Sequence, residues 1–467
     1  MAEKLVLLTG HLAEAPLRRI VAGIEENKFD IEIINMGVKV AALMTEAIVL
    51  RRLRPPADAG RVIFPGRAGL DAARLAAHFG VPFARGPDEI ADLPAFLGLN
   101  GGLRDLSRFD ITIFAEIVDA GELDETTLLA RARALVANGA DVIDLGCRPG
   151  RHFADLEAKI ASLRAEGMRV SLDSGDPEEL RRGALAGAEF LLSLTETTLP
   201  LAAGTRATAI LIPEPHGDLA SLVRAAEKAT AMGMKFIVDP ILDPIHSGLA
   251  ASLARYHETR RLLPAAEMLM GTGNLTELTD ADSAGVTAIL LGICSELGVR
   301  HVLTVQVSPH TRQTLAEHDA ARRMLFAARA DQALPRLYSE ALLQIHDRAP
   351  YPQQAADLAA LAGAVSDANF RIAVAEDGIH VFNNRLHLVR QDAFSCYPDL
   401  APGLDPAHAF YLGAELAKAE IAFRLGKRYV QDEPLRFGVA TPETEGARTR
   451  LAEAGHTLRA RDDAAHT

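Results

Sequence analysis

The sequence predicts an α/β protein whose central part is a (β/α)8 barrel, or TIM barrel. Between residues 109 and 330, eight short apolar segments recur over about two hundred residues, and most are followed by a helical segment. Continuous Val, Ile and Leu runs indicate a sheet buried on both faces. Gly-Ala or Gly-Met often precedes a strand, as expected where a helix ends in glycine. A doubly wound open sheet is the alternative that fits this pattern.

The elements follow in order along three predicted domains and a tail. Residues 1–108 form a small α/β domain, in which strands and helices alternate at 4–9, 13–26, 31–36, 61–65 and 71–79. Pro87, Pro94 and the Asn-Gly-Gly at 100–102 mark its end. The barrel, 109–330, has strands at 111–117, 141–145, 169–172, 190–193, 207–212, 235–238, 267–270 and 301–305. Its helices are expected at 126–138, 154–166, 177–188, 219–231, 249–263 and 284–297, and a further helix covers 313–330.

The third predicted domain, 331–440, is α+β. It begins with a proline-containing connector and continues with antiparallel strands at 370–375, 378–383 and 386–389. A long helix at 408–425 is a candidate dimer face, with packing inside its own domain as the alternative. We expect a homodimer. The tail, 441–467, is polar and alanine-rich and is expected to fray.

Composition limits the functional classes. The chain carries 49 Lys and Arg against 62 Asp and Glu, a net charge of −13, which argues against a broad nucleic-acid or anionic-membrane surface. No apolar run approaches the ~18 residues of a membrane span, and no cleavable signal pattern opens the sequence. Three cysteines far apart do not make a disulfide framework. We therefore expect a cytoplasmic protein that acts on small molecules.

Catalytic groups of a TIM barrel lie where strands end and βα loops begin. Reading these positions gives the candidates Glu116, Asp119, Cys147, Arg148, Arg151, Asp173, Ser174, Ser193, Thr195, Asp239, Thr272, Asn274, Ser308, His310 and Arg312. An aspartate after a strand is often only the N-cap of the next helix. Asp176, directly before Pro177, is the better cap in its loop, and no helix is expected close after Asp239. Asp173 and Asp239 are thus available to meet at the barrel centre and accept hydrogen bonds from an N–H-rich heterocycle.

The other candidates support an anionic ligand. Asn274 offers a donor and an acceptor beside the two acids. The loops also carry cationic or titratable groups, namely Arg148, Arg151, His310 and Arg312. For Arg148 and Arg151 the alternative is a solvated loop without a ligand. Glu116, Asp119 or Asp124 could hold Mg²⁺ jointly with a diphosphate, although a surface role suits Asp124 better. Gly66-Arg67-Ala68-Gly69 lacks the Lys-Ser/Thr pair of a P-loop, and no dinucleotide-binding glycine motif follows a strand.

Several motifs now identify a resemblance. Residues 139–150 (GADVIDLGCRPG) resemble the second-strand motif of dihydropteroate synthases, and residues 170–174 (VSLDS) and 238–240 (VDP) resemble their pterin-binding third and sixth strands. Residues 239–260, 270–285 (MGTGNLTELTDADSAG) and 408–438 are similar to dihydropteroate synthase-related proteins of methanogens and methylotrophs that make tetrahydromethanopterin. This resemblance covers nearly the whole chain. It implies that Asp173 and Asp239 bind a pterin.

The sequence also departs from that family. Ala115-Glu116-Ile117 replaces the first-strand Asn, and Ser193, Leu194 or Thr195 replaces the fourth-strand Asn. Gly271-Thr272-Gly273-Asn274 replaces the seventh-strand Ser-Arg-Lys and is closer to pterin methyltransferases, while Ser308-Pro309-His310 only loosely represents the eighth-strand Arg-x-His.

The resemblance implies a transferase that joins a dihydropterin hydroxymethyl diphosphate to an arylamine, namely a ribofuranosylaminobenzene phosphate, with Mg²⁺ assisting. Asp173, Asp239 and Asn274 would hold the pterin, and Arg148, Arg151, Ser193, Thr195, Thr272, Ser308, His310 and Arg312 would bind the rest of the substrates. The alternatives are a one-carbon methyl-transfer protein with the same pterin site and a non-catalytic scaffold.

Overall fold

The computed structural model describes residues 3–24, 29–88, 90–99, 105–148, 150–400 and 405–441. The chain divides into two compact units: one combines the described residues of 1–104 and 343–437, and the other spans residues 105–342 with 438–440. The predicted division into three domains stays a prediction. Its boundary at 100–102 and nearly all of its tail lie outside the described residues.

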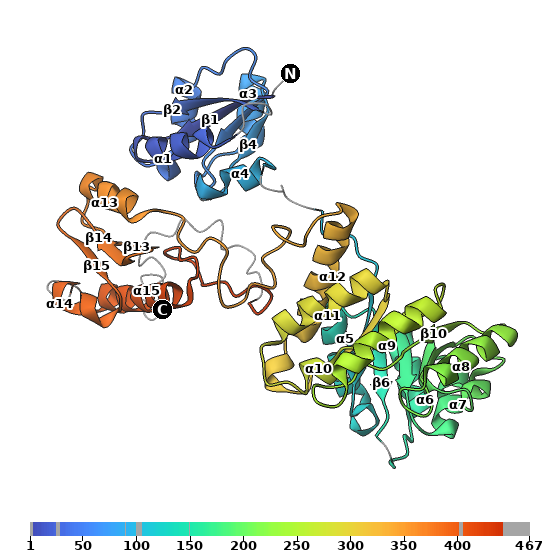
Figure 1. The fold of residues 1–467 in the computed structure, drawn as a ribbon. Coiled ribbons are helices and arrows are strands. Elements are labelled where there is room, and N and C mark those ends of the chain that lie inside the picture. Colours follow the sequence, from blue (N-terminus) through green and yellow to red (C-terminus); the bar gives the residue numbers. More distant parts are fainter. Residues whose placement is uncertain are drawn as a thin grey trace, which may run out of the picture. The chain divides into compact units, whose positions relative to one another are not determined.

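The second unit is a closed barrel of eight parallel strands, in the order β10-β11-β12-β5-β6-β7-β8-β9 (Figure 1). The strands are β5 (Thr112–Ile117), β6 (Val142–Gly146), β7 (Arg169–Asp173), β8 (Phe190–Leu194), β9 (Thr208–Leu211), β10 (Phe236–Val238), β11 (Glu267–Gly271) and β12 (His301–Val305). The predicted (β/α)8 barrel is therefore confirmed, and the open sheet is wrong because β10 pairs with β9 and closes the ring.

Helices surround the strands on the outside of this barrel (Figure 1). They are η3 (Ala120–Glu122), α5 (Glu125–Ala137), α6 (Leu156–Ala165), α7 (Pro177–Ala186), η4 (Leu199–Ala202), α8 (Leu219–Ala231), α9 (Leu249–Leu262), α10 (Gly273–Thr276), α11 (Ser283–Leu297), η5 (Pro309–Thr311) and α12 (Thr314–Ala330). Asp176 caps α7 and Asp124 caps α5, each accepting a backbone N–H. Since α9 begins only after Gly248, Asp239 is indeed free of a capping role.

The strands bury both faces. Their outward side chains and the helices form one large core. The inward side chains form a smaller core inside the barrel, made of Phe114, Val142, Phe190, Leu192, Ile210, Ile237 and Leu269. This interior layer fills the barrel and supports the residues that lie above it.

The N-terminal lobe of the first unit has a parallel sheet in the order β2-β1-β3-β4. Its elements are β1 (Glu3–Thr9), α1 (His11–Ala22), β2 (Phe29–Asn35), η1 (Ala41–Leu43), α2 (Glu46–Arg52), β3 (Arg61–Phe64), α3 (Ala72–Phe79), β4 (Phe83–Arg85), η2 (Ile90–Asp92) and α4 (Leu93–Phe96). Of these elements, α2 and β4 are not predicted from the sequence. With only three residues, β4 is too short to show a hydrophobic period.

The C-terminal lobe of the same unit is α+β, as predicted. It contains α13 (Ala355–Ala364), an antiparallel sheet of β13 (Arg371–Ala375), β14 (Gly378–Phe382) and β15 (His387–Arg390), then η6 (Phe394–Cys396), α14 (Tyr397–Leu400) and α15 (Pro406–Leu425). The helix α15 packs Leu412, Leu416, Ala419 and Ala422 into the lobe's core and leaves Phe410 exposed. The homodimer stays a prediction. Among the residues that the structure places, no helix is long and apolar enough to cross a membrane.

Candidate active site at the barrel mouth

The strand period places an acidic cluster at the carboxyl ends of the barrel strands. Side chains two residues apart on a strand face the same side. Glu116 follows the interior residue Phe114 by two positions, and Asp239 follows Ile237 in the same way. Asp173 ends β7, where it pairs in register with Gly146. Glu116 on β5, Asp173 on β7 and Asp239 directly after β10 therefore point toward the same end of the barrel, and each is half-buried.

The charges of these acids interact. Burial raises the pKa of Glu116 to about 7, with a further contribution from the negative charge of Asp173. Burial also raises the pKa of Asp239 to about 6, opposed by its hydrogen bonds and increased slightly by Asp173. The pKa of Asp173 is itself raised by burial, against a hydrogen bond from the Ser193 hydroxyl at 2.8 Å. The predicted meeting of Asp173 and Asp239 at one site is thus supported by their electrostatic interaction.

A fourth acid, Asp144, lies deeper in the barrel and is not among the site residues predicted from the sequence. It is fully buried on β6, in register with Glu116 on one side and Ser171 on the other. The Ser171 hydroxyl donates to its Oδ1 at 2.5 Å, while Oδ2 has no hydrogen-bond partner among the described residues. Burial and the charges of Asp173 and Glu116 raise the pKa of Asp144 strongly, so its neutral form is favoured.

A glycine allows Glu116 to pack closely against the end of β6. A Cβ atom added at Gly146 would lie 2.5 Å from Glu116 Oε1 and 3.0 Å from Val118 Cα, so a larger residue would displace the glutamate. Gly271, two positions after the interior residue Leu269, leaves a similar position without a side chain. A Cβ atom at Gly271 would meet no heavy atom within 4 Å, so a side chain could be accommodated there.

Tyr256 is a second site residue that is not predicted from the sequence. It is fully buried on α9, and its hydroxyl lies 2.7 Å from Asp239 Oδ1 and 3.0 Å from the Leu269 carbonyl oxygen. The backbone N–H of Ile241 donates to the same Oδ1 at 2.8 Å. These contacts fix the orientation of the Asp239 carboxyl. In the sequence, the only signal for this role is a hydroxyl-bearing residue on the buried face of the predicted helix that corresponds to α9.

Replacing Tyr256 with Phe is expected to raise the pKa of Asp239 above 6. The hydroxyl stabilises the ionised carboxylate, and hydrogen bonds to charged groups contribute about 1.5–3 kcal/mol, or roughly one to two pKa units. A carbon-13 NMR titration of the aspartate carboxyls would measure the change. Tyr338→Phe, which removes a hydroxyl from Asp331, is the matched control and should leave Asp239 unchanged. An unaltered Asp239 titration in Tyr256→Phe would contradict this role.

Glu116 makes a pH-dependent contribution to stability. Because its pKa in the folded protein is raised to about 7, ionising it costs folding free energy as the pH rises from about 4.5 through 7. Glu116→Gln is therefore expected to stabilise the barrel at pH 8 by about 3 kcal/mol and to change little at pH 4.5. Urea unfolding at both pH values checks this. Glu258→Gln, an exposed glutamate paired with Arg261, should show no gain, and equal effects of Glu116→Gln at both pH values would refute the prediction.

Several other predicted site residues lie around the mouth, and they differ in exposure and in hydrogen bonding. The Asn274 amide donates to the Leu242 carbonyl oxygen at 2.7 Å, which fixes that side chain on α10. Arg148 and Arg151 are exposed, and both pair with Glu122, at 3.0 and 3.2 Å. His310 contacts the Thr276 carbonyl oxygen through Nε2 at 3.0 Å, and Arg312 is exposed. These groups come from loops on the same end of the barrel as the acids.

Three predicted binding residues are engaged inside the fold. The Thr272 hydroxyl is buried and contacts His318 Nε2 at 2.9 Å and the Leu303 carbonyl oxygen at 3.0 Å. Thr195 accepts the backbone N–H of Thr197 and Thr198 and shapes the turn before η4. The Ser308 backbone N–H donates to Glu277 Oε2 at 3.0 Å, which holds the loop after β12. Hydrogen bonds within the fold thus engage Thr272, Thr195 and the backbone of Ser308.

The residues present do not make a protein-only metal site. Within the described ranges, no group of three His, Cys, Asp or Glu side chains is arranged to hold a metal ion. Asp119 pairs with Arg131 at 2.8 Å, and Asp124 is the cap of α5. The predicted Mg²⁺ would therefore rest on Glu116 and on substrate phosphates alone.

Comparisons with known proteins give matches of three kinds: families, a relative and solved structures. A family of unknown function, DUF6513, matches residues 3–88, and the family PterinBD-DUF4346 matches residues 398–432. The uncharacterized protein MJ0107 of Methanocaldococcus jannaschii is 27% identical over 379 residues, covering 71% of each chain. Among solved structures, the dihydropteroate synthase of Yersinia pestis in complex with a pterine-sulfa conjugate is 17% identical, with a TM-score of 0.38, and the match covers 49% of this chain and 95% of that one. The dihydropteroate synthase of Thermus thermophilus in complex with 6HMPPP is 22% identical, with a TM-score of 0.37, and the match covers 48% of this chain and 95% of that one.

Proposed function

We propose that this protein is a pterin-binding transferase. The observation that carries the proposal is the convergence of Asp173, at the end of β7, and Asp239, directly after β10, on one end of the barrel. Two carboxyls held by Ser193 and by Tyr256 with Ile241 present fixed acceptors to the amino and ring N–H groups of an amino-pyrimidinone. The name of the family that matches residues 398–432 agrees with a pterin ligand.

The reaction follows the chemistry of a dihydropterin hydroxymethyl diphosphate. Its C–O bond breaks, diphosphate leaves with the electron pair, and the arylamine nitrogen forms a C–N bond to the methylene carbon and loses a proton. Asp173 and Asp239 would stabilise the positive charge that develops on the ring. Glu116, whose pKa lies near 7, is suited to accept the arylamine proton. Arg148, Arg151, His310 and Arg312 would bind the anionic groups.

The finer assignment places this reaction in tetrahydromethanopterin biosynthesis, with ribofuranosylaminobenzene phosphate as the arylamine. It rests on the resemblance of residues 239–260, 270–285 and 408–438, and the relative in Methanocaldococcus jannaschii, a methanogen, agrees with it.

The test has two parts. Calorimetry with 6-hydroxymethyl-7,8-dihydropterin should show binding at one site per chain. Incubation of the diphosphate ester with ribofuranosylaminobenzene phosphate, or with p-aminobenzoate in a parallel reaction, should then release diphosphate only when an arylamine is present. Failure to bind the pterin would overturn the whole proposal, whereas binding without release would overturn the transferase.

A second candidate, transfer of a methyl group from a tetrahydropterin, is favoured by Asn274. Its amide is fixed on α10 at the position where the resemblance expects the lysine of a synthase. Incubation with a methyl-tetrahydropterin and a corrinoid acceptor distinguishes the two reactions. Methylated corrinoid without diphosphate release would support this candidate.

A further inference from the structure

The long helix of the C-terminal lobe, α15, is apolar on two opposite faces. Its inner face packs into the core of the lobe. Its outward face carries four exposed side chains, which we call the outer stripe: Phe410, Ala414, Ala417 and Ile421. Intervals of four, three and four positions place these residues on one line along the helix. A helix that is apolar all round is normally buried, so the outer stripe is unusual for a surface exposed to solvent.

Aromatic side chains that precede α15 extend this apolar surface. Phe394, Phe410 and Tyr397 are the most exposed phenylalanine and tyrosine side chains among the described residues, at 87%, 71% and 69%. The Ala393 N–H donates to Glu420 Oε2 at 2.8 Å, which holds η6, the turn of Phe394, beside the C-terminal half of α15. Contiguous apolar patches of this kind mark interaction surfaces.

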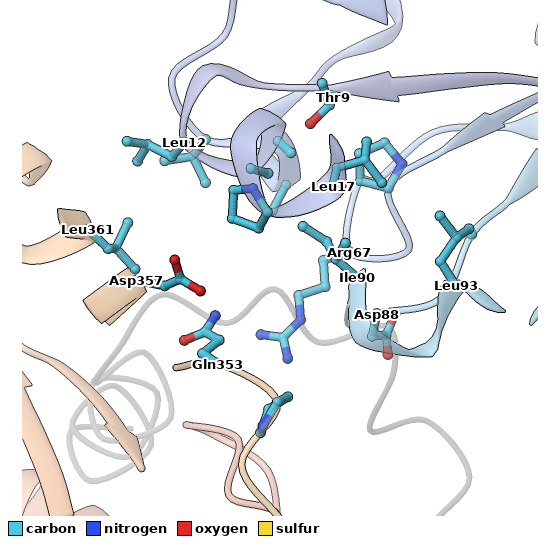
Figure 2. A pocket seen from close by; sticks show the side chains of 18 of the residues that line it. Thr9, Leu12, Leu17, Arg67, Asp88, Ile90, Leu93, Gln353, Asp357 and Leu361 are labelled. Carbon is cyan, nitrogen blue, oxygen red and sulfur yellow. The ribbon is translucent and has the colours of Figure 1, made fainter. Parts of the chain in front are cut away.

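The other apolar helix of the lobe, α13, already has a partner within the chain. It borders a cavity of about 680 Å³ whose lining also includes residues of α1 (Figure 2). Leu361 on α13 and Leu12 on α1 are among its apolar lining residues. The ion pair between Arg19 and Asp357, at 2.5 Å, connects the two helices. The apolar side of α13 thus faces the N-terminal lobe, whereas the outer stripe of α15 faces solvent.

The outer stripe is complementary to itself. From Phe410 to Ile421 it has a large, a small, a small and a large side chain, at intervals that are the same from either end. In an antiparallel pair of α15 helices related by a two-fold axis, each Phe410 packs against an Ile421 and each Ala414 against an Ala417. The alanines at the centre allow close approach, since the distance of about 8–10 Å between packed helix axes depends on the side chains at the contact.

Charges at the two ends of α15 favour the same arrangement. Asp405 caps the N-terminal end, and Arg424 lies in the last turn; both are exposed. Each makes a pair inside its own helix, Asp405 with His408 at 2.5 Å and Arg424 with Glu420 at 2.6 Å. An antiparallel pair brings the basic end of one helix to the acidic end of the other, while a parallel pair would bring like charges together. A second copy of this chain therefore matches the surface in both shape and charge.

We propose that the outer stripe, together with Phe394 and Tyr397, is the interface of a symmetric dimer in which two α15 helices pack antiparallel. Burial of the apolar side chains drives the association, and the charges at the helix ends set the orientation. The interface lies outside the barrel and does not depend on the reaction proposed for the barrel mouth.

Sedimentation velocity of the full chain over a range of concentrations tests the dimer. The parent chain should sediment with twice the mass of one chain. Ala417→Glu should sediment as a monomer, because the two-fold axis brings a carboxylate from each copy into the apolar centre, and glutamate is a good helix former that preserves α15. Ala360→Glu, at an exposed alanine of α13, is the matched control and should remain dimeric.

Phe410→Gln is a second variant, which removes an exposed side chain without adding a charge, and should raise the dimer dissociation constant by about tenfold or more. Circular dichroism checks that each variant is folded. A monomeric parent chain, or folded Ala417→Glu and Phe410→Gln variants that dimerise like the parent, would overturn the interface and leave the proposed function untouched.

Cysteine cross-linking tests the orientation. The double variant Phe410→Cys/Ile421→Cys should form a disulfide-linked dimer on mild oxidation, whereas Phe410→Cys alone should not. The parent chain is the control, because it contains Cys147, Cys294 and Cys396, of which the last two are buried. A cross-link in Phe410→Cys alone would show parallel helices, and its absence from the double variant would separate the two stripes. Either result would overturn the antiparallel pair.

Discussion

Asp173→Asn and Asp239→Asn are each expected to lower the affinity for 6-hydroxymethyl-7,8-dihydropterin by about 100-fold or more. Each substitution replaces a carboxylate acceptor by an amide, whose NH2 group would face the N–H donors of the pterin. Loss of a charge-assisted hydrogen bond together with an unpaired donor in a buried site costs about 3 kcal/mol. Both acids are fixed by neighbours, Asp173 by Ser193 and Asp239 by Tyr256, so neither can easily turn away.

Calorimetry measures the affinities, and circular dichroism checks that the fold is intact. The matched control is Asp124→Asn. Asp124 belongs to the same barrel and only caps α5, a role that asparagine fills equally well. This variant should bind the pterin like the parent protein. If both mouth variants also retained the parent affinity, the pterin site would have to be abandoned.

Arg322→Met is expected to destabilise the barrel by about 3–5 kcal/mol, because it leaves buried acceptors without a donor. Arg322 is 2% exposed on α12. It donates to the carbonyl oxygens of Ile111 at 2.8 Å and Gly139 at 3.2 Å and to the carboxylates of Asp141 and Asp319. Asp141 in turn accepts the Ile113 N–H at 2.8 Å. The Arg322 guanidinium therefore connects α12 to the starts of β5 and β6.

Urea unfolding followed by circular dichroism gives the change in stability, and hydrogen exchange of residues 111–117 locates it. Arg181→Met is the control, because Arg181 forms an exposed ion pair with Glu178 on α7, and such pairs contribute about 0–1 kcal/mol. A loss below about 1 kcal/mol in Arg322→Met, or no change in exchange at β5, would contradict the assigned role.

Much of the barrel is predictable from local pattern. Strands such as 111–117 and 301–305 are continuous apolar runs between helical segments, and the helix cap at Asp176 is visible beside Pro177. Because active groups of this fold follow strand ends, Asp173 and Asp239 are also accessible to sequence reasoning. Thr195 and Thr272 satisfy the same positional rule, yet their hydroxyls contact the turn before η4 and His318. Position relative to a strand does not determine which way a hydroxyl points.

The order of strands and helices therefore follows from the sequence, since short-range periodicity and capping govern it. The environment of Asp144 depends on closure of the ring, which brings Glu116 and Asp173 near a carboxyl that otherwise looks like one more position in a strand. Tyr256 reaches Asp239 only because α9 packs against β10 and β11. The cavity in the first unit likewise needs residues near 10, 65 and 355 to meet. Contacts of this kind join residues far apart in the chain, and they form only when the hydrophobic cores assemble.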